Sequence, residues 1–305
     1  MSFFFFATVV FSTISMIGID FGGSLIKCVE IVGNETKFTV MKIKDVVELS
    51  NMLKQKSGAK LMLTGGGSYK HNFLPHENIL PEMEALYLGY QYILEHDIQQ
   101  FYTYNPISMN KNKVARTNEC ILVNIGSGIS IIRLTQNNFA RLGGTTIGGG
   151  TFAGLGWLIC KEENIDKMFD MASLGNNFGV DLSINDIYGN CDTRNLLGLS
   201  NNLVASSFGK VSLSSDIEFS KYDILSSLLS LIVNNVCLMA ISHAEKQNMA
   251  RIVFSGCFSL QDVVQKRIVY CFHALRKTSI EPVFIEHAGH LGAFGCINWI
   301  MHNNR

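Results

Sequence analysis

The chain has 305 residues, and its 25 Lys and Arg are balanced by 25 Asp and Glu, with no basic cluster or acidic tail. This balance argues against a nucleic-acid-binding protein, and the length predicts two domains with separate cores. Charged residues are only 16% of the chain and hydrophobic residues 47%, where ~25% charged is usual. We therefore expect additional surface to be buried, either in an oligomer or against a membrane.

The cysteines are scattered and form no Cys-x-x-Cys pair of the kind that binds zinc or acts as a redox dithiol. Such spacing is typical of buried free thiols in a reducing compartment. The sequence therefore predicts a cytoplasmic protein.

Residues 1–15 form an apolar extension that includes Phe3–Phe6, with no Lys or Arg before Lys27. The run is shorter than the ~20 apolar residues of a spanning helix, and it lacks the basic region and small-residue cleavage site of a secretory signal. A targeting segment, a peripheral membrane contact through Phe3–Phe11 and a translation start at Met16 all stay open.

The first predicted elements are a strand over Met16–Asp20, a turn at Gly22–Gly23 and a second strand over Leu25–Val32, which together make a hairpin. A short strand over Lys60–Leu63 stops at a run of three glycines. Pro81 then opens a segment with apolar residues at helical spacing, and proline suits the first turn of a helix.

The same pattern restarts in the second part of the chain. Cys120–Asn124 is predicted as a strand that runs into Gly126-Ser127-Gly128, and extended structure resumes at Ile129. This repetition is compatible with two halves of common ancestry. The further elements predicted are helices over 152–159, 224–244 and 289–300, and strands over 251–254 and 282–285. Strands alternating with helices predict an α/β fold, with domains over 16–120 and 121–305.

The long helix predicted over Ile224–Ala244 carries apolar residues on more than one face. A helix with one wet side needs fewer of them. Burial inside its own domain and a dimer seam explain this pattern equally well.

Four glycine turns follow predicted strands, at Gly22–Gly23, Gly126–Gly128, Gly148–Gly150 and Ser255–Gly256. Glycine permits the dihedral angles and the close approach with which backbone N–H groups surround a phosphate. The third turn also precedes a helix, whose N-terminus favours anions. One such turn is commonly only a turn, but four together indicate a nucleotide site.

Other nucleotide motifs do not account for these turns. The P-loop pattern G-x-x-x-x-G-K-[ST] is absent. Gly148-x-Gly150-x-x-Ala153 fits the dinucleotide pattern, but no β-α-β unit with an acidic residue about twenty positions on accompanies it. Asp20, at a strand end beside glycines, is suited to hold Mg²⁺ directly or through water, and its alternative role is to cap a turn.

Eight stretches of the sequence resemble, in order, the blocks of the type II pantothenate kinases. They are IGIDFGGSLIK (17–27), GGGSYK (65–70), LVNIGSGISI (122–131), GGTTIGGGTFAGLGWLI (143–159), DIYG (186–189), VASSFGK (204–210), RIVFSGCF (251–258) and EHAGHLGAFG (286–295). The resemblance implies two ribonuclease-H-like domains of the actin-like/hexokinase-like ATPase superfamily. It also implies phosphorylation of pantothenate by ATP and Mg²⁺, a homodimer, and feedback inhibition by acetyl-CoA or other CoA thioesters.

The resemblance also assigns roles to residues. Glu82 matches the catalytic carboxylate, and its alternative role is to favour a helix N-terminus. Ser127, Ser130 and Arg141 match residues that bind substrate and acyl-CoA, and a planar guanidinium suits such anions. The ATP and phosphate positions are Asp20, Gly22, Gly23, Ser24, Lys27, Gly126, Gly128, Gly148, Gly149, Gly150, Thr151 and Gly256.

The sequence departs from the family pattern at Cys257, Ala288 and His290, which puts adenine contacts and regulation in question. Two rival functions stay open. One is a sugar kinase of the same superfamily, which would need a cluster of acidic and amide side chains that the sequence does not show. The other is a catalytically inactive homologue that senses acyl-CoA or acts as a scaffold.

Overall fold

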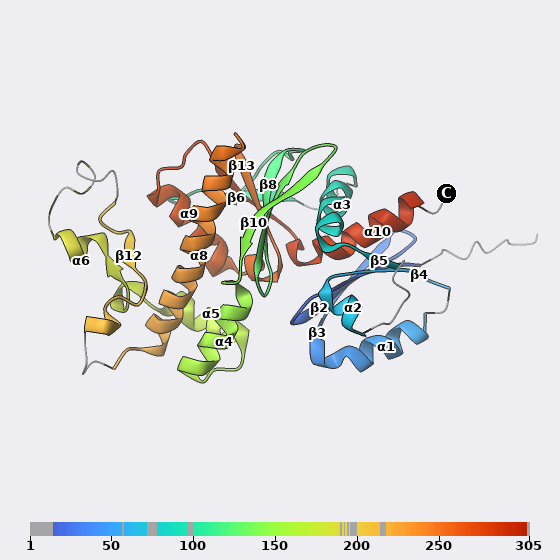
Figure 1. The fold of residues 1–305 in the computed structure, drawn as a ribbon, viewed down its shortest axis with the longest axis horizontal. Helices are drawn as coiled ribbons and strands as arrows, with labels where there is room; N and C mark the ends of the chain where they lie inside the picture. The colour runs from blue at the N-terminus through green and yellow to red at the C-terminus, as the bar shows by residue number, and fades with distance from the viewer. Residues whose placement is uncertain are drawn as a thin grey trace, which may run out of the picture. The chain divides into compact units, whose positions relative to one another are not determined.

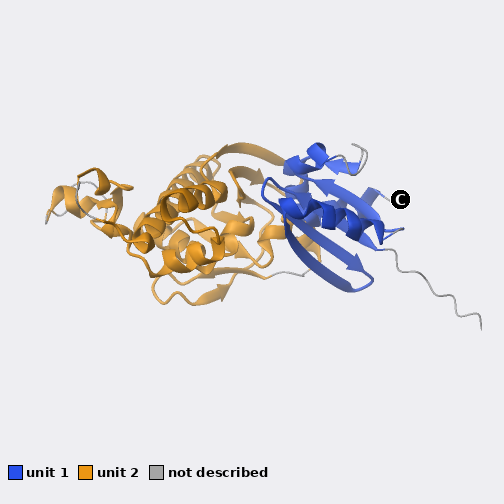
Figure 2. Cartoon of the chain, turned by 90° about the horizontal axis from the view of Figure 1, so that it is seen from below, with its two compact units in different colours: residues 1–89, 292–305 blue, residues 90–291 orange. Residues whose placement is uncertain are grey.

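The computed structural model describes residues 15–56, 58–71, 78–96, 100–189, 191, 193, 195, 200–213 and 218–303. The apolar extension predicted for residues 1–15 lies outside these residues except for Ser15. The chain divides into two compact units, one formed by residues 1–89 and 292–305 and the other by residues 90–291 (Figure 2).

The first unit is built on a five-stranded sheet in the order β3-β2-β1-β4-β5. β1 pairs antiparallel with β2 and parallel with β4, and the predicted hairpin is the β1–β2 pair. The strands are β1 (Met16–Phe21), β2 (Leu25–Val32), β3 (Glu35–Lys42), β4 (Lys60–Thr64) and β5 (Ile79–Leu80). The helices are α1 (Val46–Lys54), α2 (Gly66–His71), the start of α3 (Glu82–Glu95), and α10 (Leu291–Asn303) except its first residue.

Two apolar clusters hold this sheet to its helices. One includes Ile19 of β1, Leu63 of β4 and Leu49 of α1, all fully buried. The other joins Ala85 of α3 to Cys296 of α10. The C-terminal helix therefore completes the core of the N-terminal unit.

The second unit contains a seven-stranded sheet in the order β10-β9-β8-β13-β14-β6-β7. α8 packs against α9 and against the strands at the middle of this sheet (Figure 1). The strands are β6 (Phe101–Tyr104), β7 (Lys111–Lys113), β8 (Cys120–Ile125), β9 (Ile129–Leu134), β10 (Phe139–Thr145), β13 (Arg251–Ser255) and β14 (Glu281–Ile285). The helices are α4 (Gly149–Cys160), α5 (Ile165–Leu174), α8 (Lys221–Lys246) and α9 (Asp262–Ala274). A smaller part contains β11 (Leu182–Ser183), α6 (Ile184–Tyr188) and β12 (Val204–Ser206).

The two large sheets repeat one topology. In each sheet, three strands that are consecutive in sequence pair antiparallel, and the last two strands pair parallel. The order is β3-β2-β1-β4-β5 in the first unit and β10-β9-β8-β13-β14 in the second. The repetition predicted from the two strand–glycine turn–strand segments is therefore present in the fold.

The division between the units differs from the boundary predicted near residue 120. Residues 90–119 pack with the second unit because β6 pairs with β14 and Arg251 Nη1 donates to the Ala115 carbonyl at 2.6 Å. Residues 292–305 return to the first unit. Local sequence patterns do not indicate which segments pack with a unit that is distant in sequence.

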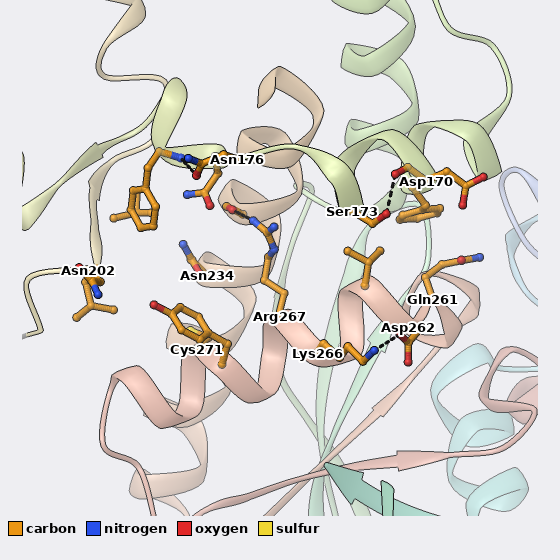
Figure 3. A pocket seen from close by; sticks show the side chains of 18 residues that line it. Asp170, Ser173, Asn176, Asn202, Asn234, Gln261, Asp262, Lys266, Arg267 and Cys271 are labelled. Carbon is orange, nitrogen blue, oxygen red and sulfur yellow. Dashed lines mark hydrogen bonds and ion pairs between the residues drawn. The ribbon is translucent and has the colours of Figure 1, made fainter. Parts of the chain in front are cut away.

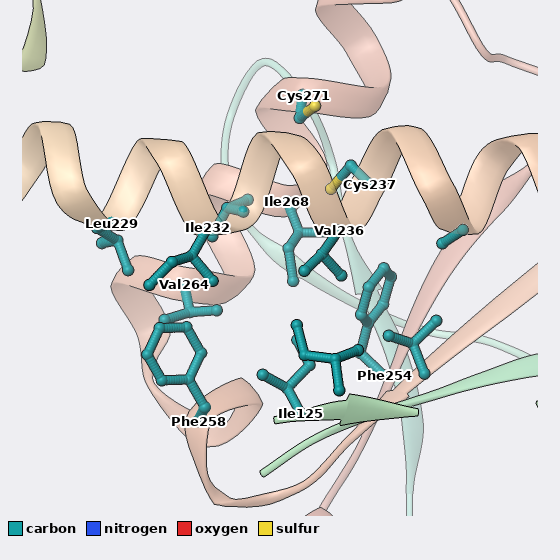
Figure 4. Close-up of a cluster of buried hydrophobic side chains, with 14 of the residues drawn as sticks. Ile125, Leu229, Ile232, Val236, Cys237, Phe254, Phe258, Val264, Ile268 and Cys271 are labelled. Atoms are coloured by element: carbon teal, nitrogen blue, oxygen red, sulfur yellow. The ribbon is translucent and has the colours of Figure 1, made fainter. Parts of the chain in front are cut away.

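α8 is largely buried inside its own unit, where Leu229, Ile232 and Val236 contribute to the main core (Figure 4). Among the described residues it is the one helix long and apolar enough to cross a bilayer, and 67% of its most apolar window is buried in the fold. Leu238 is 52% exposed. Burial within its own unit therefore accounts for most of the apolar surface of α8. A dimer interface is not needed to explain it.

Candidate active site

Asp20 and Lys27 form an ion pair at the end of the first hairpin. The two residues are direct partners across β1 and β2, and Lys27 Nζ lies 3.0 Å from Asp20 Oδ2. Both side chains are about 15% exposed, so the pair is only partly screened by water. The hairpin register thus holds a carboxylate and an ammonium group beside the glycine turn.

Glu82 begins α3 and remains exposed to solvent. Its pKa is raised above the usual value for glutamate, first because the surrounding protein limits the hydration of its carboxylate and then because Asp20 is negatively charged. The positive charge of Lys27 opposes this rise. The three groups therefore interact electrostatically, and Glu82 is an accessible carboxyl group with increased basicity.

Two further glycines border Asp20, and sequence reasoning did not assign them to the site. Gly65 follows β4 with φ of +84°, and a Cβ there would lie 2.9 Å from Asp20 Oδ1. A Cβ on Gly292, at the start of α10, would lie 3.2 Å from Asp20 Cγ. The glycine run after the predicted strand 60–63 was the available signal for Gly65. Gly292 is distant in sequence from Asp20, and its available signal was its position in the block EHAGHLGAFG.

The glycine turns of the second unit pack on each other. The N–H of Gly149 donates to the Gly126 carbonyl at 2.9 Å, and the N–H of Gly150 donates to the Ser127 carbonyl at 3.0 Å. The N–H of Gly148 donates to Thr151 Oγ1. Gly149 and Gly150 thereby fasten the start of α4 to the β8–β9 turn, whereas the Gly148 bond lies within the start of α4 itself.

In the other glycine turns, one backbone N–H group each also donates a hydrogen bond within the fold. Gly22 donates to the Leu25 carbonyl, Gly126 to the Gly128 carbonyl and Gly256 to the Ala288 carbonyl. The phosphate roles of Gly22, Gly126, Gly148, Gly149, Gly150 and Gly256 stay predictions, as do those of Gly23, Ser24, Gly128 and Thr151.

The three departures from the family pattern lie together after β13 and β14. Besides the hydrogen bond between Gly256 and Ala288, a Cβ on Gly289 would lie 2.8 Å from Cys257 Sγ, and His290 is buried beside them. Gly256 itself has φ of +91°, and a Cβ there would approach the Ile125 carbonyl oxygen to 2.3 Å. The substitutions therefore alter one local packing environment.

Arg141 and Ser130 lie on the adjacent strands β10 and β9, and the exposed Ser127 lies in the β8–β9 turn. Ser130 pairs with Gly144 across the sheet, and a Cβ on Gly144 would lie 2.9 Å from Arg141 Nη2. The bulge between Arg141 and Gly143 permits this arrangement. Among the described residues the Arg141 guanidinium has no hydrogen bond or ion pair, so it is available to an anion.

Within the described ranges, no three His, Cys, Asp or Glu side chains gather closely enough to form a metal site. Mg²⁺ at nucleotide sites usually keeps several waters and binds only one or two carboxylates in addition to phosphate oxygens. Asp20, with Glu82 nearby, supplies this number of carboxylates. Asp20 would hold the ion through Oδ1 or a water molecule, because Oδ2 already accepts from Lys27.

Comparison with protein families gives one decisive match. The profile of the Fumble family matches residues 29–298, nearly the whole chain. The chain belongs to the Fumble family, the type II pantothenate kinases. This confirms the family resemblance found in the eight sequence blocks.

Fumble relatives with more than 30% identity include a pantothenate kinase from Schizosaccharomyces pombe, 32% identical over 279 residues that cover 85% of this chain and 69% of the relative. Pantothenate kinase 1 from Arabidopsis thaliana is 31% identical, with 92% and 85% of the two chains covered. The 4'-phosphopantetheine phosphatase from Mus musculus is 36% identical over 77% of this chain. This chain spans only 30% of that relative's length.

Solved structures confirm the fold class predicted for this Fumble member. The activator of 2-hydroxyisocaproyl-CoA dehydratase from Clostridium difficile has a TM-score of 0.57 at 14% identity, with 94% of each chain covered. Component A of the Acidaminococcus fermentans (R)-2-hydroxyglutaryl-CoA dehydratase has a TM-score of 0.55 at 15% identity, with 94% and 97% covered. The chain therefore shares the α/β fold of these two solved structures.

Proposed function

We propose that this chain transfers the γ-phosphate of ATP to the primary hydroxyl of pantothenate, the first step of coenzyme A biosynthesis. The observation that carries this proposal is the group formed by Asp20, Lys27 and Glu82 in a chain of the Fumble family. Glu82 is accessible, and its raised pKa brings its basicity closer to neutral pH, where a general base is effective.

Each of the three residues has a distinct role in the transfer. Glu82 accepts the proton of the attacking hydroxyl. Asp20 would hold Mg²⁺, which would supply charge neutralisation to the transferred phosphoryl group. Lys27 holds the Asp20 carboxylate in place through their ion pair, and it limits the rise in the pKa of Glu82. Phosphoryl transfer otherwise depends mainly on positioning and electrostatic stabilisation.

Replacement of Glu82 by Gln tests the assignment of the base. The change removes the proton acceptor without altering side-chain size, so turnover of pantothenate should fall by about 10²–10⁴-fold, while ATP binding is retained. Glu84→Gln is the matched control, because Glu84 lies in the same helical turn and should retain most activity. A Glu82→Gln enzyme with more than about a tenth of wild-type turnover would be incompatible with this role.

A second candidate function is a catalytically inactive homologue that senses acyl-CoA. The observation that favours it is the mouse relative, which is named as a phosphatase although its similar region covers 77% of this chain. An assay with radiolabelled ATP and pantothenate separates the two functions. Acetyl-CoA binding without phosphorylation of pantothenate would support the second.

Feedback inhibition by CoA thioesters is proposed at Ser127, Ser130 and Arg141. The unpaired guanidinium of Arg141 near Ser130 supports an anion at this position. If acetyl-CoA overlaps both the nucleotide and the pantothenate positions, increasing ATP should relieve the inhibition. Arg141→Ala should then weaken acetyl-CoA inhibition and raise the KM for pantothenate together, and inhibition that ATP cannot relieve would contradict this arrangement.

We further propose a cytoplasmic homodimer. Support comes from the low share of charged residues and from the exposed apolar residues Trp157, Leu158 and Ile159 on α4. Light scattering on the purified protein should give twice the mass of one chain. A monomer at micromolar concentration would contradict the dimer.

A further inference from the structure

A cavity of about 730 Å³ lies within the second unit, bordered by α5, α8, α9 and the segment that leads into β12 (Figure 3). None of the residues assigned to ATP, pantothenate or acyl-CoA lines it. Its volume is in the range of small-molecule sites. Its wall carries the charged side chains Asp170, Asp262, Lys266 and Arg267.

Arg267 of α9 points into this cavity (Figure 3). Its Nη1 donates to the Ser226 carbonyl at 3.1 Å and to Ser230 Oγ, and its Nη2 donates to Ser226 Oγ at 3.0 Å. These bonds use three of the five guanidinium N–H groups. The two that are left, on Nε and Nη2, form one edge of the planar group, and such an edge matches a carboxylate or phosphate.

The charge of Arg267 has no paired carboxylate among the residues that the structure describes. Asp181 attracts it electrostatically, but the Asp181 carboxylate already accepts from Asn177, the Phe208 N–H and Ser227. At the other end of the cavity Lys266 is paired with Asp262 at 2.7 Å. Burial lowers the pKa of Arg267, which is the sign of a cation that has lost hydration without full compensation.

Neutral polar groups line the same cavity as Arg267. Neither the Asn234 amide nor the Tyr270 hydroxyl has a hydrogen-bond partner within the described part of the chain, and both line the cavity. Tyr270 also interacts electrostatically with the Arg267 guanidinium. An amide and a hydroxyl beside a half-occupied guanidinium are the groups expected around a bound oxyanion.

We propose that this cavity binds a small organic anion through a carboxylate or phosphate group held at the free edge of Arg267. The space far exceeds that of an inorganic anion, and the cavity wall also contains the apolar rings of Phe169 and Phe178. The ligand is therefore a metabolite-sized molecule with one anionic end. The inference does not depend on the kinase activity proposed above.

The experiment compares thermal stability in succinate and in inorganic phosphate with stability in chloride at the same ionic strength. A ligand that binds only the folded state raises the melting temperature. The informative variant is Asn234→Asp, which places a tethered carboxylate beside Arg267 while leaving the serine contacts intact. Asn235→Asp is the matched control, because it adds the same charge at the next, exposed position of α8.

Wild type and Asn235→Asp should be stabilised by at least one probe, and Asn234→Asp should have at least tenfold weaker affinity, as loss of a charge-assisted pair implies. In chloride, Asn234→Asp should be at least as stable as wild type. Arg267→Gln should also lose the stabilisation by succinate or phosphate. If Arg267→Gln folds poorly, Asn234→Asp still tests the proposal. The proposal is overturned if wild type responds to neither probe, or if Asn234→Asp responds as wild type does. The more stabilising probe identifies the anionic group.

Discussion

At the scale of single residues, the candidate site depends on charges that act on one another. Asp20 and Lys27 are held together by strand register, and both act on the pKa of Glu82 with opposite sign. Limited hydration of its carboxylate, together with the charge of Asp20, makes Glu82 more basic than an isolated glutamate. The electrostatics of the base can be tested separately from catalysis.

Substitution of either charge should shift the titration of Glu82 in a defined direction. Lys27→Met removes the group that lowers the pKa of Glu82, so the pKa should rise further, whereas Asp20→Asn removes a group that raises it, so the pKa should fall. Carboxyl ¹³C NMR titration of the Mg²⁺-free protein measures both shifts. Shifts of the same sign in the two variants would contradict the arrangement.

Adjacent glycines at the end of β4 offer a matched pair of substitutions. Gly65 has φ of +84° and little space beside Phe21 and Asp20, whereas a Cβ on Gly66 meets nothing within 4 Å. Gly65→Ala should therefore destabilise the protein by roughly 1–3 kcal/mol and reduce turnover. Gly66→Ala should change stability by less than about 0.5 kcal/mol, as is usual for an uncrowded position. Equal denaturation midpoints for the two variants would show that the Gly65 conformation is not required.

At the scale of elements, two family blocks meet at α6. Asp186 of the DIYG block accepts hydrogen bonds from Ser183, and its carboxylate lies 3.1 Å from Lys210 Nζ of the VASSFGK block. The Ser183 hydrogen bonds, followed by Lys210, lower the pKa of Asp186 to about 2. This carboxylate therefore contributes stability above its unfolded pKa, and the contribution is lost as the pH falls towards 2.

Ser183→Ala should loosen this part of the second unit. Ser183 caps α6 by accepting from the Asp186 N–H and donating to the Asp186 carboxylate. Loss of such a cap costs about 0.5–2 kcal/mol, so amide exchange in α6 should accelerate while exchange in α8 is unchanged. Exchange followed by mass spectrometry measures both. Unchanged protection of α6 would mean that the ion pair with Lys210 suffices to hold the helix.

At the scale of the whole molecule, each unit contains the same arrangement of antiparallel and parallel strands. The first strand of the first unit begins at Met16, directly after Ser15, whose carbonyl accepts from the Lys60 N–H at 2.9 Å. Every element of the described fold lies at or beyond Met16. We therefore predict that the apolar extension can be removed without loss of the described fold.

A protein that starts at Met16 should be soluble and active. It loses two hydrogen bonds of Ser15, to the Lys60 N–H and to the Glu30 carboxylate, each worth about 1 kcal/mol. A second truncation that retains Ser15 controls for this loss. Size-exclusion chromatography and the pantothenate assay measure the outcome. Aggregation of both truncated proteins would show that the apolar extension belongs to the fold.

Much of the fold and part of the site could be predicted from the sequence, because their signals are local. The alternation of β2, the glycines that end β1 and β8, and the start of α3 near Pro81 all arise within a few residues. The eight family blocks determined the family and thereby the fold class. β3 and α9 were missed because polar and charged residues interrupt their apolar patterns.

Tertiary structure alone decided which groups meet. Strand register pairs Asp20 with Lys27, and the return of the C-terminal helix brings Gly292 against Asp20. Packing of α4 on the β8–β9 turn uses the N–H groups of Gly149 and Gly150 that a sequence motif leaves unassigned. A motif determines which backbone shapes are possible, but the partner of each hydrogen-bonding group depends on residues far away in the chain. For that reason the sequence by itself determined the family and most of the helices and strands. Only the folded chain located the free edge of Arg267.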